Sequence, residues 1–143
     1  MGPQNIPIYP KPSDLVLLID AIIDVAGSYS RGILYRFGTQ LGERYAQGLS
    51  DEGMVEGDVL TPIMGMLKVS GWFTDYRLSR EEKSLKITVT DAFESQSREK
   101  GCDFFRGFLA GIAAVFPDLP TFYEEEKKEG CLTFTGKIEE ERA

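Results

Sequence analysis

CDFFRGFLAGIAAVF, residues 102–116, is a helical stretch with apolar residues on almost every face. Two apolar stripes run along it at helical spacing: Phe105, Phe108, Leu109, Ile112, Ala113 and Phe116 in one, and Phe104, Gly107, Gly111 and Val115 in the other. A helix that is hydrophobic all round is buried on both sides. We therefore expect this helix to lie between a sheet and either other helices or a partner subunit.

Three further helices are predicted upstream of this stretch. Residues 13–26 repeat apolar side chains at helical spacing, with Ser13 as N-cap and Gly27 as terminator. A second helix follows residue 28 and ends where residues 48–57 become rich in Gly, Ser, Asp and Glu. Its glycines Gly38 and Gly42, four apart, indicate that another backbone packs closely against it. The third helix spans about 58–69.

Two β-hairpins are predicted from alternating patterns. Residues 72–78 and 85–90 alternate with period two around a polar turn, and residues 121–127 and 131–138 form the second pair around residues 128–130. Residues 94–100 are polar and predict a loop. The fold class is therefore α+β: N-terminal helices plus a small antiparallel sheet of two hairpins with a buried helix between them.

The chain of 143 residues fits a single domain over residues 13–138. Residues 1–12 hold four prolines and predict an N-terminal arm, and residues 139–143 form an acidic tail.

Composition excludes several functions. The net charge of −7 argues against a nucleic-acid partner, and the lack of histidine removes the commonest general base and metal ligand. No apolar run approaches the ~20 residues of a membrane span, and the N-terminus has no signal-peptide pattern. With only two cysteines, we expect a cytoplasmic protein rather than a disulfide-stabilised secreted one.

Several motifs in order resemble one known family. Gly71-Trp72 opens a predicted strand, residues 89–93 end a second, CDFFRGFLAG follows at 102–111, and a Glu-rich hairpin containing Cys131 closes the domain. This order resembles the 4-vinyl reductase domain, also called the hydrocarbon-binding domain, over about residues 30–138.

The resemblance implies a small-molecule sensor with a fold similar to haem nitric-oxide-binding domains and to vesicle-tethering transport-protein-particle subunits. It implies a homodimer that encloses a small apolar or aromatic ligand and acts through a partner protein. The residues it assigns to ligand binding are Trp72, Tyr76, Phe93, Phe105, Arg106 and Phe122. Core packing is the alternative role for each aromatic residue.

The family also commonly holds a structural zinc next to its pocket. Carried over, the ligands are Cys102, either Glu124 or Glu125, and Cys131, while the family's second cysteine has no counterpart here. A zinc site with one ligand missing, two buried thiols and a disulfide all stay open for Cys102 and Cys131.

Strand alternation offers a substitute for the metal. If Phe122 points inward, Glu124 does so too, and an inward carboxylate needs a cation or hydrogen-bond donors. Arg106 lies one helical turn after Cys102, and we therefore predict that a Glu124–Arg106 pair replaces the metal.

Two other functions remain as alternatives: an adaptor or scaffold dimer of the vesicle-tethering type, and an accessory factor in tetrapyrrole biosynthesis. We expect no catalytic residues, because no base, nucleophile or glycine-rich phosphate loop is evident.

Overall fold

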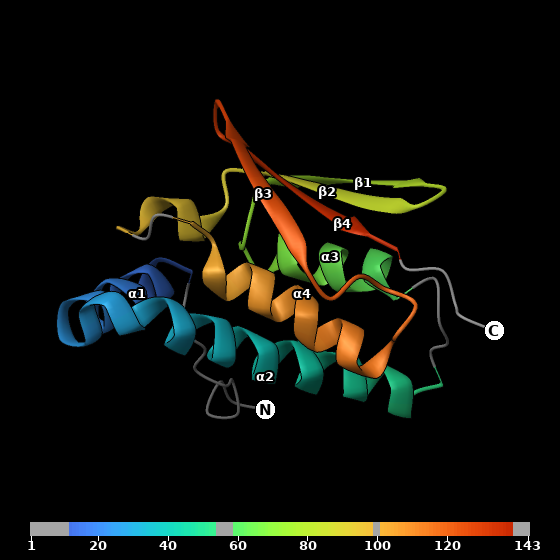
Figure 1. Ribbon diagram of the computed structural model, residues 1–143, viewed down its shortest axis with the longest axis horizontal. Helices are drawn as coiled ribbons and strands as arrows, with labels where there is room; N and C mark the ends of the chain where they lie inside the picture. The colour runs from blue at the N-terminus through green and yellow to red at the C-terminus, as the bar shows by residue number, and fades with distance from the viewer. Residues whose placement is uncertain (1–11, 54–58, 99–100, 139–143) are drawn as a thin grey trace, which may run out of the picture.

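The computed structural model describes residues 12–53, 59–98 and 101–138, and Figure 1 shows their arrangement. The elements, with η for 3₁₀-helices, are α1 (Pro12–Ala26), η2 (Gly27–Tyr29), α2 (Ser30–Asp51), α3 (Leu60–Val69), β1 (Asp75–Glu81), β2 (Ser84–Thr90), η3 (Phe93–Gln96), α4 (Asp103–Val115), β3 (Tyr123–Lys128) and β4 (Cys131–Lys137). The predicted arm over residues 1–11, the tail over 139–143 and the predicted start of the third helix lie outside the described residues.

The elements form layers with α4 in the middle. The four strands pair antiparallel in the order β1-β2-β4-β3, so the two hairpins join through β2 and β4. Figure 1 shows α4 running between this sheet and α2, with α3 also under the sheet and α1 at one end of α2. The α+β class and the buried helix between two hairpins are confirmed.

Glycines on both helices bring α2 and α4 into backbone contact. A Cβ added to Gly38 of α2 would overlap the carbonyl oxygen of Phe104, and one added to Gly107 of α4 would overlap that of Tyr35. The glycine one turn further along each helix is equally tight. The close approach predicted from the glycine spacing is therefore confirmed, and it occurs within one chain.

The first strand begins later than predicted because of how α3 ends. Gly71 has a φ of +88°, the Gly71 amide donates to the Lys68 carbonyl at 3.0 Å, and the Trp72 amide donates to Leu67 at 3.0 Å. This is a Schellman motif, which places an apolar residue against the last turn of the helix. Trp72 and Phe73 are therefore both buried ahead of β1 instead of alternating along it.

The second helix and the polar loop also differ from expectation. α2 continues through Gly48 to Asp51, and Gly53, with a φ of +92°, follows its end. Residues 93–96 form η3, whose residue Glu94 is buried.

The inward face of β3 is the opposite of the predicted one. Tyr123 pairs with Gly136 and Glu125 with Phe134, and both partners lie on the core side of β4. Directly paired residues share a face of the sheet. The predicted inward orientation of Phe122 and Glu124 is therefore wrong: Phe122 is 80% exposed, and Glu124 is also exposed.

We expect two glycines of α2 to respond in opposite ways to alanine. Gly42→Ala places a Cβ against the Phe108 backbone and should lower stability by about 1–3 kcal/mol. Gly48→Ala, where nothing lies within 4 Å of the added Cβ, should raise stability by about 0.5–1 kcal/mol through helix propensity. Thermal unfolding followed by circular dichroism measures both, and a rise for Gly42→Ala would contradict the close helix contact.

Candidate functional site

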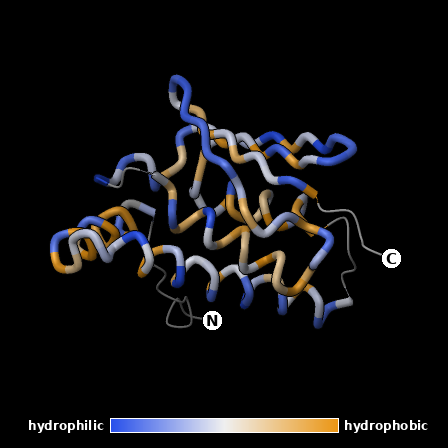
Figure 2. The backbone as a smooth tube through the Cα atoms, viewed as in Figure 1, coloured by the Kyte–Doolittle hydropathy of each residue, from blue (hydrophilic) through white to orange (hydrophobic). Residues whose placement is uncertain are grey.

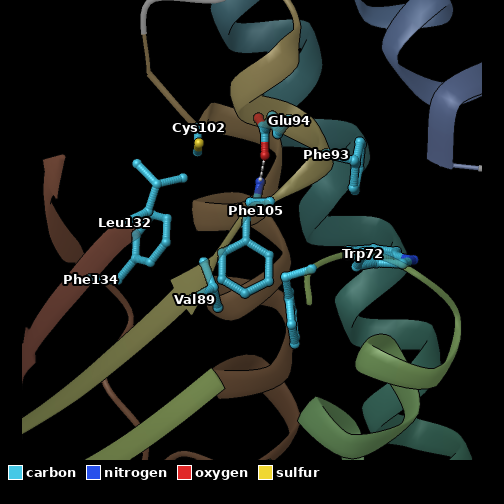
Figure 3. Close-up of a pocket in the computed structure, with 10 residues that line it drawn as sticks. Trp72, Val89, Phe93, Glu94, Cys102, Phe105, Leu132 and Phe134 are labelled. Atoms are coloured by element: carbon cyan, nitrogen blue, oxygen red, sulfur yellow. Dashed lines mark hydrogen bonds between the residues drawn. The ribbon is translucent and has the colours of Figure 1, made fainter. Parts of the chain in front are cut away.

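A small apolar cavity of about 10 Å³ lies where the sheet, α4 and η3 meet. Its lining residues are Trp72, Phe73, Val89, Ala92, Phe93, Glu94, Cys102, Phe105, Leu132 and Phe134. Figure 3 shows Phe105 in the middle of this group, with Leu132 and Phe134 on one side and Trp72 on the other. A space of this volume is about the size of one water molecule.

Aromatic packing builds the helical side of the cavity. The Trp72 ring lies 5.4 Å from Phe93, 5.4 Å from Phe104 and 5.2 Å from Phe108, measured between centroids. Phe105 of α4 reaches across to the sheet, with its centroid 5.1 Å from that of Phe134. Offset and edge-to-face pairs at these distances are favourable beyond their buried area.

Glu94 is the acidic residue of the cavity wall and is only 2% exposed. Its Oε2 accepts from the Phe104 amide at 2.9 Å and its Oε1 from the Phe105 amide at 3.0 Å. These amides belong to the first turn of α4, which has no partner within the helix for its N–H groups. Glu94 therefore caps α4 from outside and at the same time fixes η3 above the cavity.

Glu94 is not among the predicted site residues, because the polar residues 94–100 predict a loop. One signal was present: the buried helix starts after Cys102, which is a poor N-cap. A buried helix start without Ser, Thr, Asp or Asn at its cap needs an acceptor from elsewhere in the chain.

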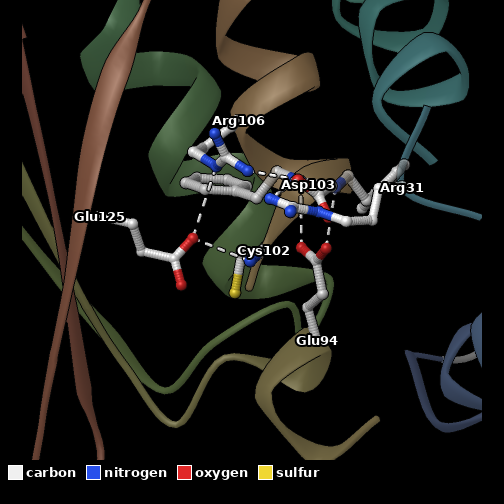
Figure 4. A network of polar contacts seen from close by, with 8 residues as sticks. Arg31, Glu94, Cys102, Asp103, Arg106 and Glu125 are labelled. Atoms are coloured by element: carbon white, nitrogen blue, oxygen red, sulfur yellow. Dashed lines mark hydrogen bonds and ion pairs between the residues drawn. The ribbon is translucent and has the colours of Figure 1, made fainter. Parts of the chain in front are cut away.

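Two arginines and two further carboxylates surround the same helix end (Figure 4). Asp103, whose side chain is 5% exposed, accepts from Arg31 Nε at 3.1 Å and Arg31 Nη2 at 3.4 Å, and it also pairs with Arg106. Glu125 Oε1 accepts from the Cys102 amide at 2.8 Å and lies 3.5 Å from Arg106 Nε. These contacts join α2, α4 and β3 at one point.

The carboxylate of β3 that pairs with Arg106 is Glu125, one residue after the predicted Glu124. Arg106 pairs with Glu125 and not with Glu124, because β3 turns its odd-numbered residues toward α4. The predicted Glu124–Arg106 pair is therefore wrong, and Glu125 is the inward glutamate that meets Arg106.

The structure does not bring the proposed zinc ligands together. Cys102 lines the cavity on the core side of the sheet, whereas Cys131 Sγ lies 3.6 Å from Thr90 Oγ1 on the opposite face. Glu124 pairs with Thr135, four residues along β4 from Cys131. No group of three or more Cys, Asp or Glu suited to a metal occurs within residues 12–53, 59–98 and 101–138, and both cysteines are unlinked thiols. The ligand set Cys102, Glu124 and Cys131 is therefore wrong as a site.

The six predicted ligand-binding residues divide into two groups. Trp72, Phe93 and Phe105 line the cavity. The other three do not: Tyr76 is half-buried with its ring 6.0 Å from that of Phe73, Arg106 belongs to the charged network, and Phe122 is exposed.

A second feature is an exposed apolar face on α1, η2 and the first half of α2. We call it the outer apolar face, and its large side chains are Leu17 (68% exposed), Leu18 (45%), Val25 (90%), Tyr29 (80%), Ile33 (46%) and Phe37 (39%). Figure 2 shows hydrophobic residues on the outer turns of α1. Leu18 and Phe37 line the same small apolar hollow at the seam of α1 and α2, so the two halves of the face adjoin.

Comparison with known proteins assigns this chain to no family. A scan against protein-family models finds no match, and a search of curated proteins finds no relative. The resemblance to the 4-vinyl reductase domain stays a prediction. Across the described part of the chain, no helix combines the length and hydrophobicity needed to cross a membrane.

Neighbouring glutamates of β3 provide a test of the charged network. Glu125→Gln should lower the free energy of unfolding by about 1–2 kcal/mol, because it weakens charge-assisted contacts to the Cys102 amide and Arg106. Glu124→Gln makes the same charge change on the exposed face and should alter it by less than about 0.5 kcal/mol. Urea denaturation compares them, and equal effects would contradict the assignment of Glu125.

Proposed function

We propose that this chain is a small-molecule-binding domain of the 4-vinyl reductase type, which takes a small apolar or aromatic ligand beside Trp72. The observation that supports this proposal most is the cavity itself, which lies inside an aromatic cluster at the junction of sheet, buried helix and η3. Ligand sites of this kind are mostly apolar with few polar groups. The two unlinked thiols support a cytoplasmic location, where cysteines stay reduced.

The cavity is too small for such a ligand in this state, so a ligand must displace part of its wall. Its volume of about 10 Å³ is far below the ~150 Å³ that accommodates benzene in an apolar protein cavity. Under this proposal, the structure is the unliganded form of the domain. Ligand binding is then coupled to a rearrangement of the residues that line the cavity.

Trp72 is the only tryptophan of the chain and provides a direct measurement. Labelling with 5-fluorotryptophan gives one ¹⁹F resonance, which we expect to shift saturably when naphthalene is added, because Trp72 lines the cavity. Val89→Phe, which fills the cavity from β2, should abolish the shift. Leu17→Asp on the outer apolar face should leave it unchanged. A shift that never saturates, or one that survives Val89→Phe, would refute ligand binding at this site.

We propose further that the domain is a homodimer joined through the outer apolar face. A helix with apolar residues on both sides is covered on both sides, and only Ile19 of α1 is buried within the chain among its large apolar residues. Exposed apolar side chains that adjoin one another are typical of an interaction site. The adaptor alternative uses the same face.

Charge favours a second copy over an anionic membrane as the occupant. α1 carries three aspartates and no basic residue, which opposes an anionic lipid surface. The face is bordered by both signs, with Asp24 beside Val25 and the exposed Arg36 beside Phe37. A two-fold interface must be self-complementary, and this distribution allows α1 of one copy to lie against α2 of the other.

Sedimentation velocity tests the dimer. The wild-type chain should sediment as a dimer, and the double variant Leu17→Asp, Val25→Asp as a folded monomer, because charges are placed in the apolar face. Phe122→Asp, an equally exposed apolar residue on the loop before β3, should remain dimeric. A wild-type monomer, or dissociation by Phe122→Asp alone, would contradict this interface.

A further inference from the structure

One wall of the cavity, residues 92–94, belongs neither to a paired strand nor to α4 but to the connection between β2 and α4. Val89, Leu132 and Phe134 belong to paired strands and Phe105 to a helix packed on both sides. Ala92, Phe93 and Glu94 belong instead to the connection that contains η3. Paired strands and helices packed on both sides open rarely, whereas a segment held by fewer contacts opens at lower free energy.

This connection is internally tied over residues 92–98, which we call the roof segment. The Ser95 amide and hydroxyl donate to the Ala92 carbonyl at 3.1 and 2.7 Å. The Ser97 amide and hydroxyl donate to the Glu94 carbonyl at 3.1 and 2.7 Å. Because these bonds lie within the roof segment, they are kept when it moves as a unit.

The roof segment is attached to its surroundings at Phe93, whose amide donates to the Trp72 carbonyl at 2.9 Å, and by two sets of charged contacts. One is the Glu94 carboxylate on the first turn of α4. The other is Arg98, whose amide donates to Asp20 Oδ1 at 2.8 Å and whose Nη2 donates to the Asp20 carbonyl at 3.0 Å and to Asp24 Oδ1 at 2.7 Å. The hydrogen bond that Arg98 donates to Asp24 raises the pKa of Arg98. The second set of charged contacts ends on α1, which packs on the core through Ile19 and partly buried neighbours and leaves its other side exposed.

We propose that the roof segment is a lid over the cavity and that α1 is its latch, released when the Arg98 contacts to Asp20 and Asp24 break. Lifting the lid breaks the hydrogen bond from the Phe93 amide to the Trp72 carbonyl, withdraws Phe93 and Glu94 from the cavity wall, exposes Trp72 and frees the Phe104 and Phe105 amides together. What passes under the lid rests on the proposed ligand-binding function, but the movement of the lid does not.

The test therefore uses no ligand. Trp72 is 7% exposed, and its quenching by acrylamide reports how often the lid opens. Arg98→Ala removes the side-chain half of the latch and should raise the quenching constant about fivefold, as expected for loss of exposed charge-assisted contacts. Arg44→Ala removes an exposed arginine from the C-terminal half of α2 and should leave the quenching constant at its wild-type value.

Hydrogen exchange separates lid opening from general loss of stability. In Arg98→Ala, exchange should accelerate at the Phe104 and Phe105 amides, which Glu94 holds, while Leu109 and Ile112 further along α4 stay protected. Acceleration of all four amides to the same degree, or an unchanged quenching constant, would overturn the lid. A lid that behaves as stated while naphthalene fails to bind would refute the ligand proposal alone.

Discussion

Backbone contact between α2 and α4 is the constraint on which the rest of the structure depends. Glycines at matching places on the two helices allow the carbonyl oxygens of each to approach the other, so α4 has no solvent on that side. The sheet covers its opposite side. A helix enclosed in this way also buries its first turn, where N–H groups lack partners within the helix. Protein groups must then replace the water that an exposed helix end would bind.

The charged residues around Cys102 follow from that requirement. Glu94 and Glu125 reach the helix start from η3 and β3, and each accepts from backbone amides there. The positive end of the helix dipole favours carboxylates at this place, and Arg106 and Arg31 balance the added negative charge. One set of contacts thus satisfies the helix end and positions η3 above the cavity. The site is therefore a consequence of burying α4 rather than a separate addition to the fold.

The sequence predicts the features that depend on local periodicity and misses those that depend on pairing across the chain. The apolar stripes of residues 102–116 and the glycine pairs predict the buried helix and its close contact correctly. The inward face of β3 was predicted wrongly. A two-residue turn sets the register of this strand, and a slip of one residue moves every side chain to the other face. Glu94 was missed because a buried acid looks the same in sequence as a solvated one, and only its distant amide partners distinguish them.

Under the proposed ligand-binding function, the placement of Glu94 also restricts what the cavity would accept. Both of its oxygens are turned toward α4 amides, so its polar atoms already have partners. An anion placed beside Glu94 would meet a carboxylate, and a cation would have to compete with two backbone donors for it. A neutral ligand does neither and gains from the aromatic side chains around Trp72. The same hydrogen bonds that complete the helix therefore favour an uncharged, apolar or aromatic occupant over a charged one.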